Sequence, residues 1–198
     1  MVSSELPLRM QLLVQLGASV WRGDWLGLER TALAAKTAMV PRADAEEVLL
    51  QAVLFCGFPR VVTAFEALGN AWPAEHAPHG GALPQEEQAS AGRALFAAIY
   101  GRNDEAVRAM LAGYHQEFHD FVLEAAYGRI LARPGLPPRE RELIAVGTLA
   151  AMDQLRQFVA HARGALQFGS SPAELREVLA LVLGESPQVD AWLQRVRR

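Results

Sequence analysis

The chain is poor in cysteine, with Cys56 alone among its 198 residues, and this excludes a disulfide within one molecule. A single cysteine fits a reducing compartment, so we expect a cytoplasmic protein. Positive charge is not in excess either, because the formal net charge is −3, which gives no electrostatic reason to expect binding to nucleic acid or an anionic membrane. Long uncharged apolar runs are also lacking. The run 143–152 lies between Glu142 and Asp153 and is too short to span a bilayer.

Strand patterns are lacking as well, since no stretch of useful length alternates apolar and polar residues. Hydrophobic residues make up 51% of the chain, and the dominance of Ala and Leu favours helices. We therefore predict an all-α fold, built as one domain or as two small packed ones. In the middle of the chain, helices are expected to begin near Pro84 and Asp104, and a helix over 114–131 is expected to turn Phe118 and Phe121 inward.

An internal repeat joins the two ends of the chain. Residues 6–17 match residues 136–147 at an offset of 130, and farther along Gly57 matches Gly184 at an offset of 127. We expect this three-residue shift to lie in a loop between helices, where changes of length are tolerated. Repeats of this size usually bury an apolar face against each other. The predicted division is a degenerate first repeat over 1–70, connecting loop and helices over 71–112, and a second repeat over 113–198 that carries the site.

The second repeat pairs a carboxylate with an imidazole, Glu142 and His161, nineteen residues apart. One continuous helix would hold them roughly 28 Å apart. Asp153 is a good N-cap, so the sequence predicts a new helix there, and two antiparallel helices would leave a mismatch of roughly 4.5 Å in depth. A carboxylate that orients an imidazole is a proton-transfer arrangement. The alternatives are a core histidine bonded to a backbone carbonyl, and a Glu142 that is solvated or paired with Arg139 or Arg141.

The first repeat offers an internal comparison for this pair. On the alignment above, Glu142 corresponds to Leu12 and His161 to about Ala34. A fold that tolerates an apolar pair at these positions does not need the polar one for packing. The comparison therefore favours a functional role for Glu142 and His161.

At these residues the chain resembles the carboxymuconolactone decarboxylase and alkylhydroperoxidase D superfamily. In the peroxidase branch a Glu stands nineteen positions before the His of a Cys-x-x-Cys-x-x-x-His motif, and the two cysteine positions are Gln154 and Gln157 here. Residues 121–136 and 49–61 are similar to segments of the decarboxylase branch, which generally has Ser at the position of Glu142. The resemblance implies a tandem repeat of the alkylhydroperoxidase D-like helical fold, no cofactor, and a homo-oligomer, with a trimer as the first expectation.

Glutamine can neither attack a peroxide nor form a disulfide, so the dithiol peroxidase chemistry is not expected at Gln154 and Gln157. The leading hypothesis is a decarboxylase-like lyase that uses acid/base chemistry, without cofactor, on a small carboxylated lactone or organic acid. His161 would transfer the proton and Glu142 would fix its tautomer, while Arg139 and Arg141 are the candidates for holding a substrate carboxylate.

Two other functions stay open. Cys56 would serve a one-cysteine peroxidase, although its apolar neighbours favour an inert thiol. The chain would otherwise be a non-catalytic oligomeric paralogue. No metal site is expected: the pair His76 and His79 is taken as part of a solvated loop, and the i, i+4 pair His115 and His119 lacks a third ligand.

Overall fold

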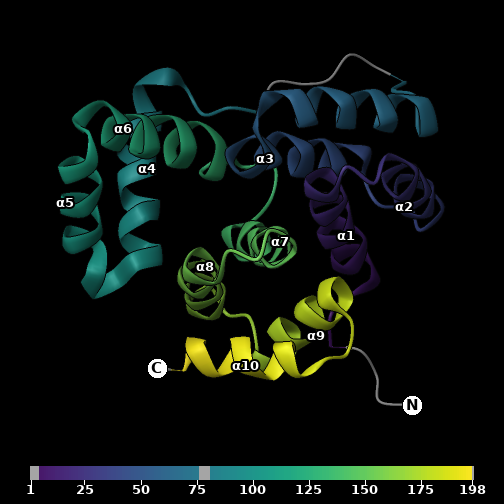
Figure 1. Ribbon diagram of the computed structural model, residues 1–198. Helices are drawn as coiled ribbons and strands as arrows, with labels where there is room; N and C mark the ends of the chain where they lie inside the picture. Colours follow the sequence, from purple (N-terminus) through teal and green to yellow (C-terminus); the bar gives the residue numbers. More distant parts are fainter. Residues whose placement is uncertain (1–4, 76–80, 198) are drawn as a thin grey trace. The chain divides into compact units, whose positions relative to one another are not determined.

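A computed structural model describes residues 5–75 and 81–197, and every regular element within them is helical, which confirms the predicted all-α class. The chain forms two compact units, one made of Met1–Pro78 with Arg139–Arg198 and the other of His79–Pro138. The helices of the first unit are α1 (Leu8–Arg22), α2 (Trp25–Thr37), α3 (Arg42–Ala71), α7 (Pro138–Ala151), α8 (Leu155–Gln167), α9 (Pro172–Leu183) and α10 (Pro187–Val196) (Figure 1). The first residue of α7, Pro138, is assigned to the second unit.

The first unit contains both copies of the repeat, which we call copy one (α1 to α3) and copy two (α7 to α10). In each copy the first helix ends in a left-handed residue, the second helix follows at once, and a second left-handed residue precedes the third helix. These left-handed positions are Gly23 (φ 66°) and Asp153 (φ 57°) after the first helix, and Met39 (φ 57°) and Gly169 (φ 92°) after the second. Both pairs are 130 residues apart, so this offset holds through the first two helices of each copy.

The three-residue shift lies inside the third helix, and the expectation of a loop was wrong. In copy one the third helix starts at Arg42 and its backbone breaks at Gly57 (φ 75°, ψ 167°). In copy two α9 starts at Pro172 and stops at Gly184 (φ 73°, ψ 168°), after one turn less. The starts of the two helices are 130 residues apart, whereas the breaks at Gly57 and Gly184 are 127 residues apart. The three-residue difference is one turn, which α9 lacks.

This register corrects two expectations about the site region. At the offset of 130, His161 corresponds to Thr31 and not to Ala34. Asp153 does not cap α8, because its own φ is 57° and Gln154 takes the N-cap position. Asp tolerates the left-handed region better than most residues, so Asp153 acts here as the turn residue, as Gly23 does in copy one.

Two glycines at equivalent positions let α1 and α7 approach each other closely. A Cβ at Gly17 would lie 2.7 Å from Oγ1 of Thr148, and one at Gly147 would lie 2.5 Å from Cγ1 of Val14. Neither contact leaves room for a side chain without movement of the neighbour. The two copies therefore pack together through their first helices, α1 against α7.

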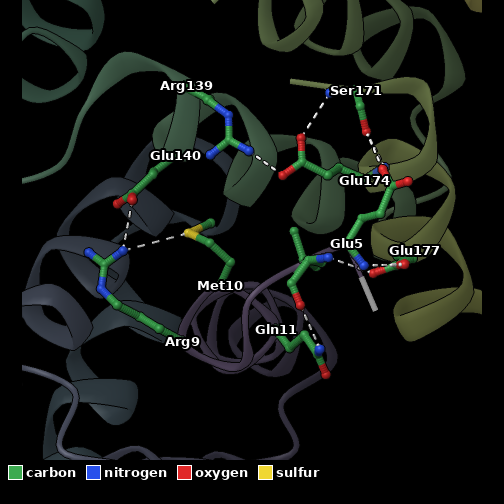
Figure 2. Close-up of polar contacts among 10 residues, drawn as sticks. Glu5, Arg9, Met10, Gln11, Arg139, Glu140, Ser171, Glu174 and Glu177 are labelled. Carbon is green, nitrogen blue, oxygen red and sulfur yellow. Dashed lines mark hydrogen bonds and ion pairs between the residues drawn. The ribbon is translucent and has the colours of Figure 1, made fainter. Parts of the chain in front are cut away.

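Ion pairs at equivalent positions join the first and third helix of each copy. Arg9 binds Asp44 at 2.7 Å, and Arg139 binds Glu174, in both cases with a buried carboxylate. Arg9 also binds Glu140 of α7 at 2.7 Å, which connects the two copies (Figure 2). At the start of α1, Glu177 of α9 accepts the backbone N–H groups of residues 5 and 6 at 2.9 and 2.8 Å (Figure 2).

α3 is the one described helix that is long and apolar enough, by length and composition alone, to cross a membrane. Its backbone breaks at Gly57, which leaves two straight stretches on the order of 22 Å each. Each is shorter than a hydrocarbon core of about 30 Å. Leu49 before the break and Leu68 after it are fully buried, so both halves contribute to the core of the first unit.

The second unit is a separate helical cluster. Its elements are α4 (Gln85–Tyr100), η1 (Gly101–Asn103), α5 (Asp104–Tyr114), α6 (Gln116–Phe121) and η2 (Val122–Leu131), the last with wide π-type turns. Gly92 and Gly128 let α4 and η2 touch, since a Cβ at Gly92 would lie 2.4 Å from the carbonyl oxygen of Leu123. The helix expected over 114–131 is interrupted at His115, whose backbone is extended. The expected inward side chains are wrong too: Phe118 and Phe121 are exposed by 48% and 63%.

Candidate functional site

The structure brings Glu142 of α7 and His161 of α8 into direct contact. Nδ1 of His161 lies 3.0 Å from Oε2 of Glu142. The residues are only 7% and 1% exposed, respectively. The spacing of nineteen residues therefore does bridge a helical hairpin, as the sequence predicted.

The local sequence places both side chains in the interior. On α7 every residue from 141 to 150 is buried, so Glu142 lies within the most enclosed stretch of its helix. On α8 the buried side chains follow the helical period, and His161 shares that face with Phe158, Ala162 and Ala165. The left-handed turn at Asp153 then sets α8 against α7 with these two faces opposed.

The electrostatics of the pair favour a protonated imidazole. Burial by itself lowers the pKa of His161, but the charge of Glu142 and the hydrogen bond to it outweigh burial, and the pKa is raised above its usual 6.5. The carboxylate also accepts the proton on Nδ1, which fixes the tautomer of the neutral ring. The remaining nitrogen, Nε2, has no hydrogen-bond partner among the residues that the structure describes.

Phe55 is a neighbour of the pair that sequence reasoning missed. Its ring meets the imidazole of His161 edge to face, with the centroids 6.0 Å apart and the planes at 78°. Phe55 lies in the last turn of α3 before the break at Gly57. The equivalent helix of copy two, α9, is one turn shorter before its own break at Gly184. The site thus takes an aromatic wall from copy one, and the only signal in the sequence was that Phe55 falls in the segment similar to the decarboxylase branch.

Both arginines proposed for substrate binding have partners within the first unit. Arg139 is paired with Glu174. Arg141 is 1% exposed, lies 2.7 Å from Glu47, and exchanges hydrogen bonds with Gln51, whose Nε2 donates to the carbonyl oxygen of Arg141 at 2.8 Å. Their role toward a substrate stays a prediction, and it would require a substrate carboxylate to displace or share these partners.

The thiol and amide positions bear on peroxide chemistry. Burial raises the pKa of Cys56 to about 11, with a small opposing effect from Arg60, so the thiol is protonated at neutral pH. Gln154 and Gln157 flank the start of α8 and are exposed. No thiolate is therefore available beside His161 among the described residues.

The histidine pairs considered for metals give no cluster in the part of the chain that can be described. Within residues 5–75 and 81–197, no group of three or more His, Cys, Asp or Glu side chains is placed to hold a metal ion. His119 lies 2.8 Å from Asp120 of its own helical segment. His76 and His79 lie outside the described residues.

Comparison with known proteins agrees with this geometry. The model of the carboxymuconolactone decarboxylase family matches residues 1–69 and again residues 116–184, which together are more than half of the chain. A 4-carboxymuconolactone decarboxylase of Acinetobacter baylyi is 30% identical over 69 residues, which are 35% of this chain and 52% of that enzyme, so the match spans about half the length of the relative. The doubled family match fits the two structural copies, and the chain belongs to the carboxymuconolactone decarboxylase family.

Proposed function

We propose that the chain is a decarboxylase-like lyase that acts by acid/base chemistry, without a cofactor, on a small carboxylated lactone or organic acid. One observation carries the proposal: His161 and Glu142 form a buried pair at 3.0 Å that leaves Nε2 of the imidazole without a partner among the described residues. Membership of the family, and the similarity to a decarboxylase over half of its length, support the substrate class.

The proposed step is a proton transfer from Nε2 to carbon. The bond between the carboxylate and its neighbouring carbon breaks, carbon dioxide leaves, and the electron pair stays on that carbon, delocalised into the lactone or acid carbonyl. The protonated imidazole then delivers its Nε2 proton to the carbon and becomes neutral. Glu142 contributes in two ways, because its charge stabilises the imidazolium before the transfer and its hydrogen bond holds the ring in one orientation.

Phe55 would define one wall of the reacting space. Its ring lies in an edge-to-face contact with the imidazole, and an apolar neighbour strengthens the electrostatic effect of Glu142 by excluding water. Arg139 and Arg141 remain the proposed contacts for a substrate carboxylate, with the condition that their pairs with Glu174 and Glu47 rearrange.

Peroxide reduction through Cys56 is the rival reaction. A thiol with a pKa of about 11 is almost entirely protonated at neutral pH, and the thiolate is the nucleophile in peroxide reduction. The structure thus gives this reaction less support than proton transfer.

The test is a screen of the purified chain with carboxylated lactones and with alkyl hydroperoxides. We expect release of carbon dioxide from at least one carboxylated lactone, unchanged in Cys56→Ser and lost in His161→Ala with the helical circular dichroism intact. Phe55→Leu serves as the matched variant for the wall, because it keeps the apolar character and should reduce the rate without abolishing it.

Two outcomes would overturn the proposal. Hydroperoxide turnover that depends on a dithiol reductant and disappears in Cys56→Ser would favour the peroxidase. Absence of turnover on every lactone, with wild-type folding and a titrating His161, would favour the non-catalytic paralogue.

A further inference from the structure

Copy one contains a cavity of about 210 Å³ between α1, α2 and the end of α9, all within the first unit. Thr31 lines it, and Thr31 is the counterpart of His161 at the offset of 130. Asp24 and Gly27 also line it and correspond to Gln154 and Gln157. The cavity is therefore the copy-one equivalent of the space beside the candidate acid–base site. It is formed by α1, α2 and the turn between them, which correspond to α7, α8 and their turn in copy two.

Three polar groups of this cavity are absent from copy two. Ser19, Arg22 and Arg30 line it, whereas the corresponding residues at the offset of 130 are apolar, namely Leu149, Met152 and Ala160. Copy one thus lacks the acid–base pair but has gained a hydroxyl and two guanidinium groups around the equivalent space. Of these three residues, Arg22 and Arg30 are exposed and Ser19 is buried.

Ser19 is the most informative of these residues. It is only 9% exposed, it lines the cavity, and its hydroxyl has no hydrogen-bond partner among the described residues. Serine in a helix commonly bonds the carbonyl four residues earlier, as Thr31 does with the carbonyl of Gly27 at 2.8 Å. A hydroxyl that lines the cavity without a partner among the described residues is available to a bound molecule.

No ion pair joins Arg22, Arg30 and Asp24 among the described residues. Nη2 of Arg22 donates to the carbonyl oxygen of Val182 at 2.5 Å, which anchors this guanidinium at the end of α9. Arg30 has no hydrogen bond or ion pair with any described residue. Oδ1 of Asp24 accepts the backbone N–H of Gly27 at 2.9 Å, so its second oxygen is left for another donor.

We infer that this cavity is a second small-molecule site, which binds a hydroxycarboxylate of a few carbons. Arg30 and the free N–H groups of Arg22 would take the carboxylate, since a guanidinium matches its geometry. Asp24 and Ser19 would take the hydroxyl, the first as acceptor and the second as donor. The volume is below the roughly 300–1,000 Å³ of sites for drug-sized molecules, which favours a small metabolite. The site is separate from Glu142 and His161 and does not depend on the function proposed for them.

Calorimetric titration of the full chain with L-malate and with succinate tests the inference, because the two dicarboxylates differ only in one hydroxyl. Wild-type protein should bind malate at least about tenfold more tightly than succinate, as one satisfied hydrogen bond of about 1.4 kcal/mol predicts. Arg30→Gln should weaken malate binding by about tenfold or more. Ser19→Ala should bring malate close to succinate, and a thermal melt of this variant checks that the fold is intact.

Two matched variants complete the experiment. Arg93→Gln removes the same charge from an exposed position of α4, and His161→Ala removes the candidate acid–base group, so both should bind malate as the wild type does. The inference fails if the wild type does not bind malate, if Arg30→Gln binds it unchanged, or if succinate binds as tightly. It also fails if His161→Ala loses binding, because the ligand would then occupy the acid–base site.

Discussion

Copy one and copy two have the same helical frame but place their polar groups in opposite ways. Copy two buries Glu142 against His161, where copy one has Leu12 and Thr31. Copy one instead surrounds its equivalent space with polar groups that copy two lacks. The difference shows that these positions are not needed for the fold, because the same turns and helices form with either set.

The ion pairs that both copies share have a structural explanation. The first helix of each copy has an arginine that pairs with a buried carboxylate on the third helix, Arg9 with Asp44 and Arg139 with Glu174. A pair that occurs at equivalent positions of both copies is explained by the stability of the helical fold that they share. Arg139 therefore has a structural role in the frame, and its proposed contact with a substrate carboxylate would be additional to that role.

Copying the residues of copy one into copy two gives the largest expected effect. The double variant Glu142→Leu with His161→Thr should lose the proposed lyase activity by about 10²- to 10⁴-fold, the usual contribution of a positioned proton donor. Its free energy of unfolding should change by no more than about 1–2 kcal/mol, because an uncharged pair that the same fold accommodates in copy one replaces a buried ion pair. Denaturant unfolding and a turnover assay measure the two effects.

A matched single variant sharpens this prediction. His161→Thr alone leaves Glu142 buried without its partner and should cost about 3 kcal/mol of unfolding free energy, more than the double variant. If the double variant keeps full activity, the pair is not catalytic. If it unfolds while the single variant does not, the pair is a requirement of packing and the comparison between the copies has misled us.

Removing the shared arginines should give smaller and unequal losses of stability. We expect about 2–3 kcal/mol for Arg9→Gln and about 1–2 kcal/mol for Arg139→Gln, measured by denaturant unfolding. Arg9 contacts both Asp44 and Glu140, whereas Glu174 keeps the backbone N–H of Ser171 at 2.8 Å after Arg139 is replaced. Equal losses would show that the connection between the copies through Glu140 adds nothing. Activity lost in Arg139→Gln at full stability would restore its role in substrate binding.

The smallest effect concerns the titration of His161. Glu142→Gln should lower the pKa of His161, because the amide accepts the ring N–H but does not offset the cost of burying the charged ring. The folded-state pKa of the wild type lies above the usual 6.5, so the pair contributes its full stability below pH 6.5 and loses it as the pH rises through the folded value. The stability advantage over Glu142→Gln should therefore shrink with rising pH. Imidazole proton resonances report the pKa, and an unchanged value would show that Glu142 does not raise the pKa of His161.

The frame and the acid–base pair were predictable because they follow local rules. Helical periodicity identified the buried face of α8, and the spacing of nineteen residues required a hairpin that could bring Glu142 to His161. Phe55 was not predictable in this way, because it belongs to the other copy and only tertiary packing places it beside His161.

Three errors came from features that have no local signal. The lost turn of α9 is invisible in the sequence because the break at Gly184 repeats the break at Gly57, and an alignment places the gap in either a helix or a loop. Asp153 is a good N-cap by type, but its neighbour Gln154 takes that position. Phe118 and Phe121 have the composition of a buried face but no covering helix within their unit.

The close crossing of α1 and α7 at Gly17 and Gly147 has a consequence for how the protein is made. The two glycines contact residues about 130 positions away in the chain, so α1 leaves the ribosome long before its packing partner. At about 5–20 residues per second the wait is on the order of 6–26 s. During this interval copy one exposes the apolar face that α7 will cover, and contacts of such long range form slowly even in the complete chain.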